Sequence, residues 1–362
     1  MTLLGSSTVR RAPKRTQIVE ELRRRIVQGE VALGQQLPSR VKLARDFAVS
    51  SNTMHGALNV LVKEGFVLSQ PSQGTFVAEK PPHLSRYAIV SSPDNSRIWR
   101  SFSASLHREI GTLETEAGCR FVFYNNITGH TDTLEYQEIL RDIRSHRVAG
   151  LLFYGDFPSA SGLCDTPVIT APDIPRVILN SDARQDTFAG LPSICTDDRA
   201  LFDRALDYLR ARGRSRIALL EGGRSVAEDV ADFEARLARR GMTTRPHWRL
   251  DLAVEQAEKV TALLLSLPAS ERPDALILLS ETLIEPVAAA IHSSSAQAGR
   301  DVDVVAHCNL RAVGVPSVPV RRIGCDMRLR LRIALDLLGR QNCGEVVPVH
   351  TMLQPRFEDE VS

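Results

Sequence analysis

The chain has 362 residues, 43% of them hydrophobic and 24% charged, which is typical of a soluble globular protein with two or three domains. No apolar run approaches the ~20 residues of a membrane-spanning helix, so the sequence excludes that class. Residues 1–80 hold 12 Lys and Arg against 6 Asp and Glu, whereas the remainder holds 33 against 37. This uneven charge favours a nucleic-acid partner for the first part only.

Three short helices and a hairpin are predicted in residues 16–78, after a disordered tail over residues 1–15. Thr16 is suited to cap the first helix, Ser39 the second, and either Ser50 or Ser51 the third. Apolar residues recur at helical spacing in each helix. Residues 66–77 then form two strands around a small polar tip.

The outward face of the predicted third helix is short and polar, as a surface that reads a DNA groove should be. The residues on it include Ser51, Asn52, Thr53 and His55. An inert structural bundle remains the alternative, but it has no need of such an exposed face.

The pattern LPSxxxLAxxFxVSxxTxxxALxxLxxEG, followed by GTFV, resembles the winged helix-turn-helix domain of the GntR regulator family. The resemblance implies that Ser39, Ser50 and Thr53 lie near the phosphate backbone, with Gly74 and Thr75 in the wing. Basic side chains nearby add charge for backbone contacts. The full set of predicted DNA contacts is Ser39, Arg40, Lys42, Arg45, Ser50, Ser51, Asn52, Thr53, His55, Gln73, Gly74 and Thr75.

Three positions depart from the family pattern. Val41, Ser51 and His55 stand where members of the family commonly carry arginine. Arginine bound to guanine is the commonest specific base contact, so we expect an operator different from the family's usual one.

Residues 79–86 are predicted to be a linker stiffened by two prolines. In residues 87–362, short apolar strands alternate with amphipathic helices, a pattern typical of parallel sheets covered on both faces. The length favours two α/β lobes. The expected lobes are residues 87–183 with 312–338, and residues 184–311 with 339–362.

Polar side chains follow the predicted strands, where α/β sheets bind ligands. Hydrogen-bonding groups beside aromatic rings suit a neutral polyhydroxyl ligand, because each hydroxyl can donate and accept. Polar residues also cap helices in any such fold, so the set carries more weight than its members. The predicted ligand contacts are Ser92, Asp94, Trp99, Tyr154, Asn180, Asp182, Ser280, Glu281, His307, Cys308 and Asn309.

Several segments resemble the sensor domains of the LacI/GalR regulators: IPRVILN from Ile174, PDAL from Pro273, VVAHCN from Val304 and IGCD from Ile323. The resemblance implies an α/β, periplasmic-binding-protein-like clamshell of parallel sheets, crossed by three strands and preceded here by the winged helix-turn-helix. By position it adds Asp326 to the predicted ligand contacts. Arabinose repressors also join a GntR-type reader to such a sensor.

The expected function is therefore a ligand-responsive DNA-binding regulator. It is expected to be a cytoplasmic homodimer that represses carbohydrate-utilisation genes at a palindromic operator and responds to a sugar-like effector. Two alternatives stay open: an architectural DNA-binding regulator with a degenerate sensor, and a sugar-modifying enzyme that carries a DNA-binding domain. The sequence lacks HExxH, GxSxG, GxGxxG and phosphate-loop motifs, so we expect no enzyme.

The cysteines stand singly and none has the spacing of a metal-binding pair. We therefore expect no metal and no cofactor. Isolated thiols in a long chain suit the reducing cytoplasm. The first 15 residues lack the apolar core of a secretion signal. The cysteines occupy positions 119, 164, 195, 308, 325 and 343.

Overall fold

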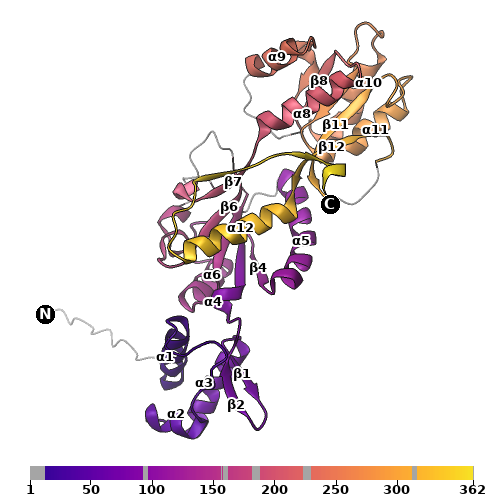
Figure 1. Cartoon of the computed structure of the whole chain (residues 1–362). Coiled ribbons are helices and arrows are strands. Elements are labelled where there is room, and N and C mark those ends of the chain that lie inside the picture. The colour runs from indigo at the N-terminus through magenta and orange to yellow at the C-terminus, as the bar shows by residue number, and fades with distance from the viewer. Residues whose placement is uncertain are drawn as a thin grey trace, which may run out of the picture. The chain divides into compact units, whose positions relative to one another are not determined.

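The computed structural model describes residues 13–92, 97–155, 157, 162–181, 188–222, 230–311 and 316–361 (Figure 1). The chain forms two compact units. The first comprises Met1–Ser91, Ala117–Leu152 and Ser159–Arg176, and the second comprises Ser92–Glu116, Phe153–Pro158 and Val177–Ser362. Among the described residues, no helix is long and apolar enough to cross a membrane.

The first unit begins with a winged helix-turn-helix. Its elements are α1 (Lys14–Val27), α2 (Arg40–Asp46), α3 (Ser51–Lys63), β1 (Val67–Gln70) and β2 (Gly74–Val77). The Ser39 hydroxyl accepts a hydrogen bond from the amide of Lys42 at 3.3 Å, and the Ser50 hydroxyl accepts from the amide of Thr53 at 3.1 Å. The predicted caps of α2 and α3 are therefore present.

The helices and hairpin of this domain close over one core. Met54, Ala57, Leu61 and Phe66 are fully buried at its centre. The hairpin strands pair antiparallel from Val67 opposite Val77. The predicted cap at Thr16 is wrong, because α1 begins at Lys14 after Pro13 and has no side-chain cap hydrogen bond. Residues 14 and 15 therefore belong to the helix and not to the tail.

The predicted linker of residues 79–86 contains one helical turn, α4 (Pro82–Ser85), and ends at the start of β3 (Arg86–Ser91). Pro82 lies beside Gly65, at the end of α3, and the ring of His83 stacks on Phe66 at 5.9 Å between centroids. The segment therefore packs against the winged helix-turn-helix domain (residues 14–77), which we call the reader domain, as well as connecting that domain to β3.

The stacked imidazole of His83 should make the stability of this unit depend on pH. Burial is the main reason that its pKa falls from 6.5 to about 4, and the charge of His146 adds to the shift. The folded chain favours the neutral ring. The contribution of His83 to the free energy of unfolding is therefore fully present above pH 6.5 and is lost as the pH falls towards 4.

A His83→Phe variant keeps a ring against Phe66 and does not titrate. Between about pH 7.5 and about pH 4.5, its melting temperature should fall less than that of the wild type. An equal fall in melting temperature for the two proteins over this pH range would contradict the expectation.

A network of charged side chains, which we call the junction network, joins the end of α3 to residues in and just after a later helix of the first unit. Glu64 pairs with Arg23 of α1 at 2.5 Å and with Arg147 at 3.5 Å. Arg147 also pairs with Asp142 of α6 (Leu134–Arg144), and Asp142 pairs with Arg86 at 2.8 Å. Asp142 is buried, so its charge depends on these partners.

The first sheet has the strand order β13-β7-β6-β5-β3-β4. The pairs β3–β4, β6–β7 and β7–β13 are parallel. Helices α5 (Arg97–Ala117) and α7 (Pro167–Thr170) lie between its strands in the chain, and α12 (Met327–Asn342) precedes its last strand. The remaining strands are β4 (Arg120–Tyr124), β5 (Gly150–Tyr154), β6 (Arg176–Ser181), β7 (Ser193–Thr196) and β13 (His350–Leu353).

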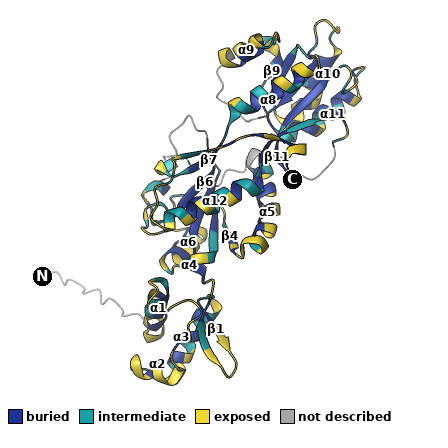
Figure 2. Ribbon diagram, in the orientation of Figure 1, coloured by how far each residue is buried: buried dark blue, intermediate teal, exposed yellow. Residues whose placement is uncertain are grey.

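The second sheet has the order β14-β12-β11-β10-β8-β9, and only β14 runs antiparallel to its neighbour among the paired strands. Figure 2 shows its central strands as buried. Its strands are β8 (Ile217–Leu220), β9 (Arg249–Leu250), β10 (Ala275–Leu278), β11 (Asp303–Leu310), β12 (Arg321–Asp326) and β14 (Arg356–Phe357).

Successive residues of these strands enter two separate cores, as the two-residue period of a strand requires. Leu276 and Leu278 pack with α10 (Val254–Ser266) and α11 (Ile284–His292). Ile277 packs with α8 (Asp198–Ala211) and α9 (Val230–Arg239). The prediction of a parallel sheet covered on both faces is thus confirmed.

The predicted lobe boundaries need correction at three strands. β7 and β13 fall in the range assigned to the second lobe, but both belong to the first sheet. β12 falls in the range assigned to the first lobe, but it pairs with β11 in the second sheet. Periodicity identifies a strand but not its partner, and each of these three strands is the last one before the chain crosses to the other sheet.

Candidate functional site

The first candidate site is the exposed face of α3. Ser51, Asn52 and His55 are exposed on it, and Thr53 is half-buried. His55 Nε2 lies 3.2 Å from the side-chain amide nitrogen of Asn59, one turn further along the helix. Short polar groups at the start of a helix are able to approach base edges in a major groove.

Basic and hydroxyl groups surround the start of this helix. A shallow hollow is lined by Lys14, Arg45, Ser50 and Thr53, together with apolar residues of α2 and of the turn that follows it. Lys14 was not among the predicted contacts, because the sequence placed it in the tail. Arg40 and Lys42 are exposed on α2.

The tip of the hairpin exposes Gln73 and Gly74, and Thr75 is half-buried. The backbone carbonyl of Gln73 accepts a hydrogen bond from the side chain of Gln36 at 2.5 Å. Gly74 has a φ of 119°, which an L side chain rarely adopts, and a Cβ there would meet Gln36. The tip therefore requires glycine at this position.

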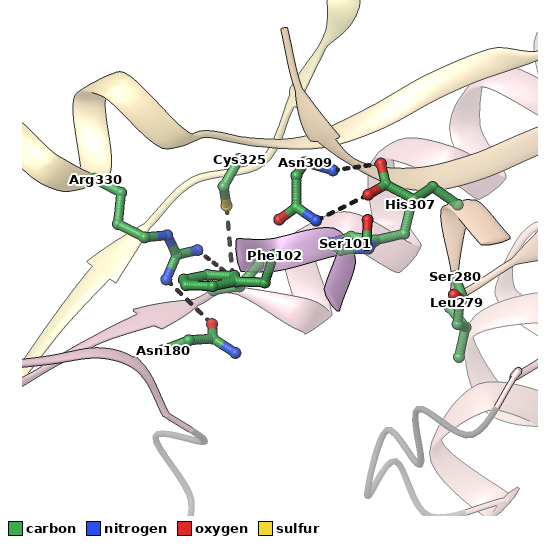
Figure 3. Close-up of a pocket in the computed structure, with 11 residues that line it drawn as sticks. Ser101, Phe102, Asn180, Leu279, Ser280, His307, Asn309, Cys325 and Arg330 are labelled. Atoms are coloured by element: carbon green, nitrogen blue, oxygen red, sulfur yellow. Dashed lines mark hydrogen bonds between the residues drawn. The ribbon is translucent and has the colours of Figure 1, made fainter. Parts of the chain in front are cut away.

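The second candidate site is a pocket in the second unit (Figure 3). Five predicted ligand contacts meet there: Asn180, Ser280, Glu281, His307 and Asn309. They come from the ends of three strands, β6, β10 and β11, or from the residues that follow them. The other residues that line the pocket are Ser101, Phe102, Thr196, Leu279, Cys325 and Arg330.

Arg330 of α12 organises one end of the pocket. It is 3% exposed and donates hydrogen bonds to Asn180 Oδ1 and Thr196 Oγ1, both at 3.1 Å. It also donates to the carbonyl oxygens of Leu179 and Ile194. Its guanidinium lies over the ring of Phe102, 5.7 Å from the centroid. These contacts hold the ends of β6 and β7 beside the pocket.

Glu281 marks the other end. Its carboxylate accepts two hydrogen bonds from Asn309, one from the backbone amide and one from the side-chain amide, each at 3.1 Å. Burial raises the pKa of Glu281, and the two bonds from Asn309 oppose that rise. The adjacent Ser280 hydroxyl accepts from the amide of Thr282 and so begins the turn that carries Glu281.

The remaining predicted ligand contacts do not line this pocket. Tyr154 contacts the pocket residue Phe102, with 5.6 Å between ring centroids, and Ser92 is buried beside Tyr154. Cys308 points into the core on the opposite face of β11, where burial raises its pKa. Asp326 caps α12 and pairs with Arg311 at 3.2 Å.

Three predicted contacts lie wholly or partly outside the described residues. Asp94 and Asp182 are not described, and Trp99 is described only as part of α5. Within the ranges that the structure describes, no group of three or more His, Cys, Asp or Glu side chains could hold a metal ion.

Sequence comparison assigns the first domain. Residues 14–77 match the family model "Bacterial regulatory proteins, gntR family". The chain is 36% identical over 70 residues to a probable rhizopine catabolism regulatory protein, MocR, of Rhizobium meliloti. It is 35% identical over 94 residues to an uncharacterized HTH-type transcriptional regulator, YdfD, of Bacillus subtilis (strain 168). The chain spans only 14% and 19% of the lengths of these relatives.

Solved structures with a similar fold each cover 75% of the chain. A LacI-family regulatory protein from Chloroflexus aggregans is 19% identical, with a TM-score of 0.58 and 96% of its length covered. A LacI-family transcriptional regulator from Arthrobacter sp. FB24, in complex with lactose, is 19% identical (TM-score 0.57, 97% covered). The lac repressor dimer bound to operator and the anti-inducer ONPF is 17% identical (TM-score 0.56, 91% covered). The predicted fold class, a GntR-type winged helix-turn-helix followed by parallel α/β sheets with the fold of LacI-family structures, is therefore confirmed.

Proposed function

We propose that this protein is a ligand-responsive, DNA-binding transcriptional regulator, a repressor of carbohydrate-utilisation genes that works in the cytoplasm. The observation that carries the proposal is the presence, in one chain, of a GntR-type reader and a LacI-type fold with a polar pocket. The reader binds operator DNA through the start of α3 and the hairpin tip. The pocket takes a small sugar-like effector.

The proposed mechanism is a shift between two states. Two copies of the chain hold their DNA-binding domains on a palindromic operator; the lac repressor, which shares the fold, is a dimer in its complex with operator. An effector changes operator affinity only to the extent that it binds one state more tightly than the other. The lactose complex of the Arthrobacter relative supports a carbohydrate as the class of effector.

Two other functions are distinguishable by simple measurements. An architectural DNA-binding regulator with a degenerate sensor would show no change in operator affinity with any pocket ligand. A sugar-modifying enzyme would turn over a sugar or sugar phosphate at a measurable rate. Neither alternative is favoured by a specific contact among the described residues of the pocket.

The DNA partner is tested with Arg45→Ala. Arg45 lies in the hollow at the start of α3 and is exposed. Loss of one phosphate contact should weaken binding to specific and non-specific DNA alike and lower the slope of log affinity against log salt by about 0.9.

Lys63→Ala is the matched control for this experiment. It removes the same charge from the exposed last turn of α3, away from the turns proposed to read DNA. Its salt slope should remain that of the wild type. Equal slopes for Arg45→Ala and the wild type would remove Arg45 from the interface, and absence of DNA binding by the wild type would refute the proposed function.

A further inference from the structure

We propose that the effector is a polyhydroxyl compound that carries one anionic group, with that group at the Asn180–Arg330 end of the pocket and its hydroxyls donating to Glu281. The inference rests on the proposed function, because it assumes that this pocket takes the effector. It replaces the neutral ligand expected from the sequence with an acidic one. It follows from the direction of the hydrogen bonds inside the pocket.

The first step concerns the side-chain amide of Asn180. Arginine only donates hydrogen bonds, so the Asn180 atom 3.1 Å from Arg330 Nη1 is the amide oxygen. The amide nitrogen is then the group left for a ligand. Figure 3 shows this nitrogen turned away from Arg330. Asn180 therefore offers the pocket a hydrogen-bond donor.

Thr196 offers a second donor at the same end. Its hydroxyl oxygen accepts from Arg330 Nη2 at 3.1 Å and from Cys325 Sγ at 3.5 Å. A hydroxyl has two lone pairs and one proton, so these bonds leave the proton for another partner. Arg330 itself remains positively charged in any protein environment. Two donors beside a fixed positive charge match the acceptor oxygens of a carboxylate or phosphate.

The opposite end has the reverse polarity. Asn309 gives both of its amide donors, backbone and side chain, to Glu281. Its side-chain oxygen is thus left as an acceptor, and each carboxylate oxygen of Glu281 has a further lone pair. An anionic group would meet the carboxylate of Glu281 at this end, although the charges of Arg108 and Arg322 also act on that carboxylate. A hydroxyl can donate to it. The polarity therefore fixes the orientation of the ligand.

A neutral sugar fits this arrangement less well. Its hydroxyls can satisfy Glu281, but at the Arg330 end they offer uncharged acceptors only. Hydrogen bonds to an ionised acceptor are roughly twice as strong as those between neutral groups. We therefore expect an acid to bind at least about tenfold more tightly than its parent sugar.

The experiment measures binding to the full-length protein by thermal shift and titration calorimetry. The probes are glucose and galactose, the acids gluconate, glucuronate and galacturonate, and glucose 6-phosphate. The acids distinguish a carboxylate from the phosphate ester as the anionic group. Tight binding of at least one anionic compound, and weak or absent binding of its parent sugar, is the expected result.

Two variants with side chains of nearly unchanged size test whether the pocket has donors at the Asn180–Arg330 end and acceptors at the Glu281 end. Asn180→Asp keeps an oxygen for Arg330 but replaces the donor with a carboxylate, so anion affinity should fall more than about tenfold while neutral sugars are little affected. Glu281→Gln removes the acceptor charge at the other end, and it should not weaken the acids more than the neutral sugars.

Equal affinities for acids and neutral sugars, or equal losses for both classes in Asn180→Asp, would overturn the inference and leave the proposed function standing. Absence of binding by every probe would overturn both the inference and the proposed carbohydrate response.

Discussion

Replacing Gly324 with alanine should lower the free energy of unfolding by about 3 kcal/mol, the upper part of the range for overpacked sites. Gly324 of β12 lies opposite Cys308 of the parallel strand β11. A Cβ at Gly324 would lie 3.0 Å from the carbonyl carbon of Cys308 and closer still to its oxygen. These are backbone atoms, so the clash is relieved only by separating two paired strands.

Gly339→Ala is the matched control for this variant. Gly339 is exposed in α12, and a Cβ there would have no atom within 4 Å. Alanine is the better helix former, so this change should stabilise the protein by about 0.5–1 kcal/mol. Urea unfolding measures both variants. Similar effects at the two positions would show that β12 does not approach β11 as closely as described.

Removing the carboxylate of Asp142 should cost about 3 kcal/mol or more, because breaking a buried ion pair leaves its partners uncompensated. Asp142 is 5% exposed. It pairs with Arg86 and Arg147, and it accepts a hydrogen bond from the hydroxyl of Tyr124 at 2.5 Å. Burial and this hydrogen bond to Asp142 both raise the pKa of Tyr124, so the phenol remains a donor.

Asp142→Ala is compared with Asp336→Ala by chemical unfolding. Asp336 is an exposed residue of α12 whose side chain lies 4.0 Å from Arg340, one turn away. Such surface pairs contribute about 0.3–0.5 kcal/mol, so this control should be nearly neutral. Asp142→Asn should fall between the two, because it keeps an acceptor for Tyr124. An alanine variant as stable as the Asp336 control would contradict the role assigned to the junction network.

The sequence predicted the reader domain well because its signals are local. A serine three residues before a free amide is sufficient to cap α2 and α3, and the buried positions of α3 follow from helical spacing. The pocket was predicted in part for the same reason: five of its eleven residues were predicted, because they lie at or just after the ends of apolar strands. Cys308 could have been excluded, because alternation along β11 places it on the opposite face from His307 and Asn309.

Other parts of the pocket depend on tertiary contacts. Arg330 and Phe102 lie on helices. Packing between segments that are distant in the sequence decides which face of each helix meets the edge of a sheet. Thr196 and Cys325 belong to strands that were not predicted. The assignment of β7, β12 and β13 to the two sheets depends on non-local pairing, for which a single sequence holds no local signal.

The join between β12 and α12 has a mechanical consequence. The strand ends at Asp326 and the helix begins at Met327, with no loop between them. The Asp326 carboxylate accepts from the amides of Arg328 and Leu329, which fixes the first turn of the helix. Only a few backbone dihedral angles separate a paired strand of the second sheet from Arg330. The segment between β12 and Arg330 is therefore stiff. A ligand that displaced Arg330 would also displace the end of β12, because no flexible loop lies between them.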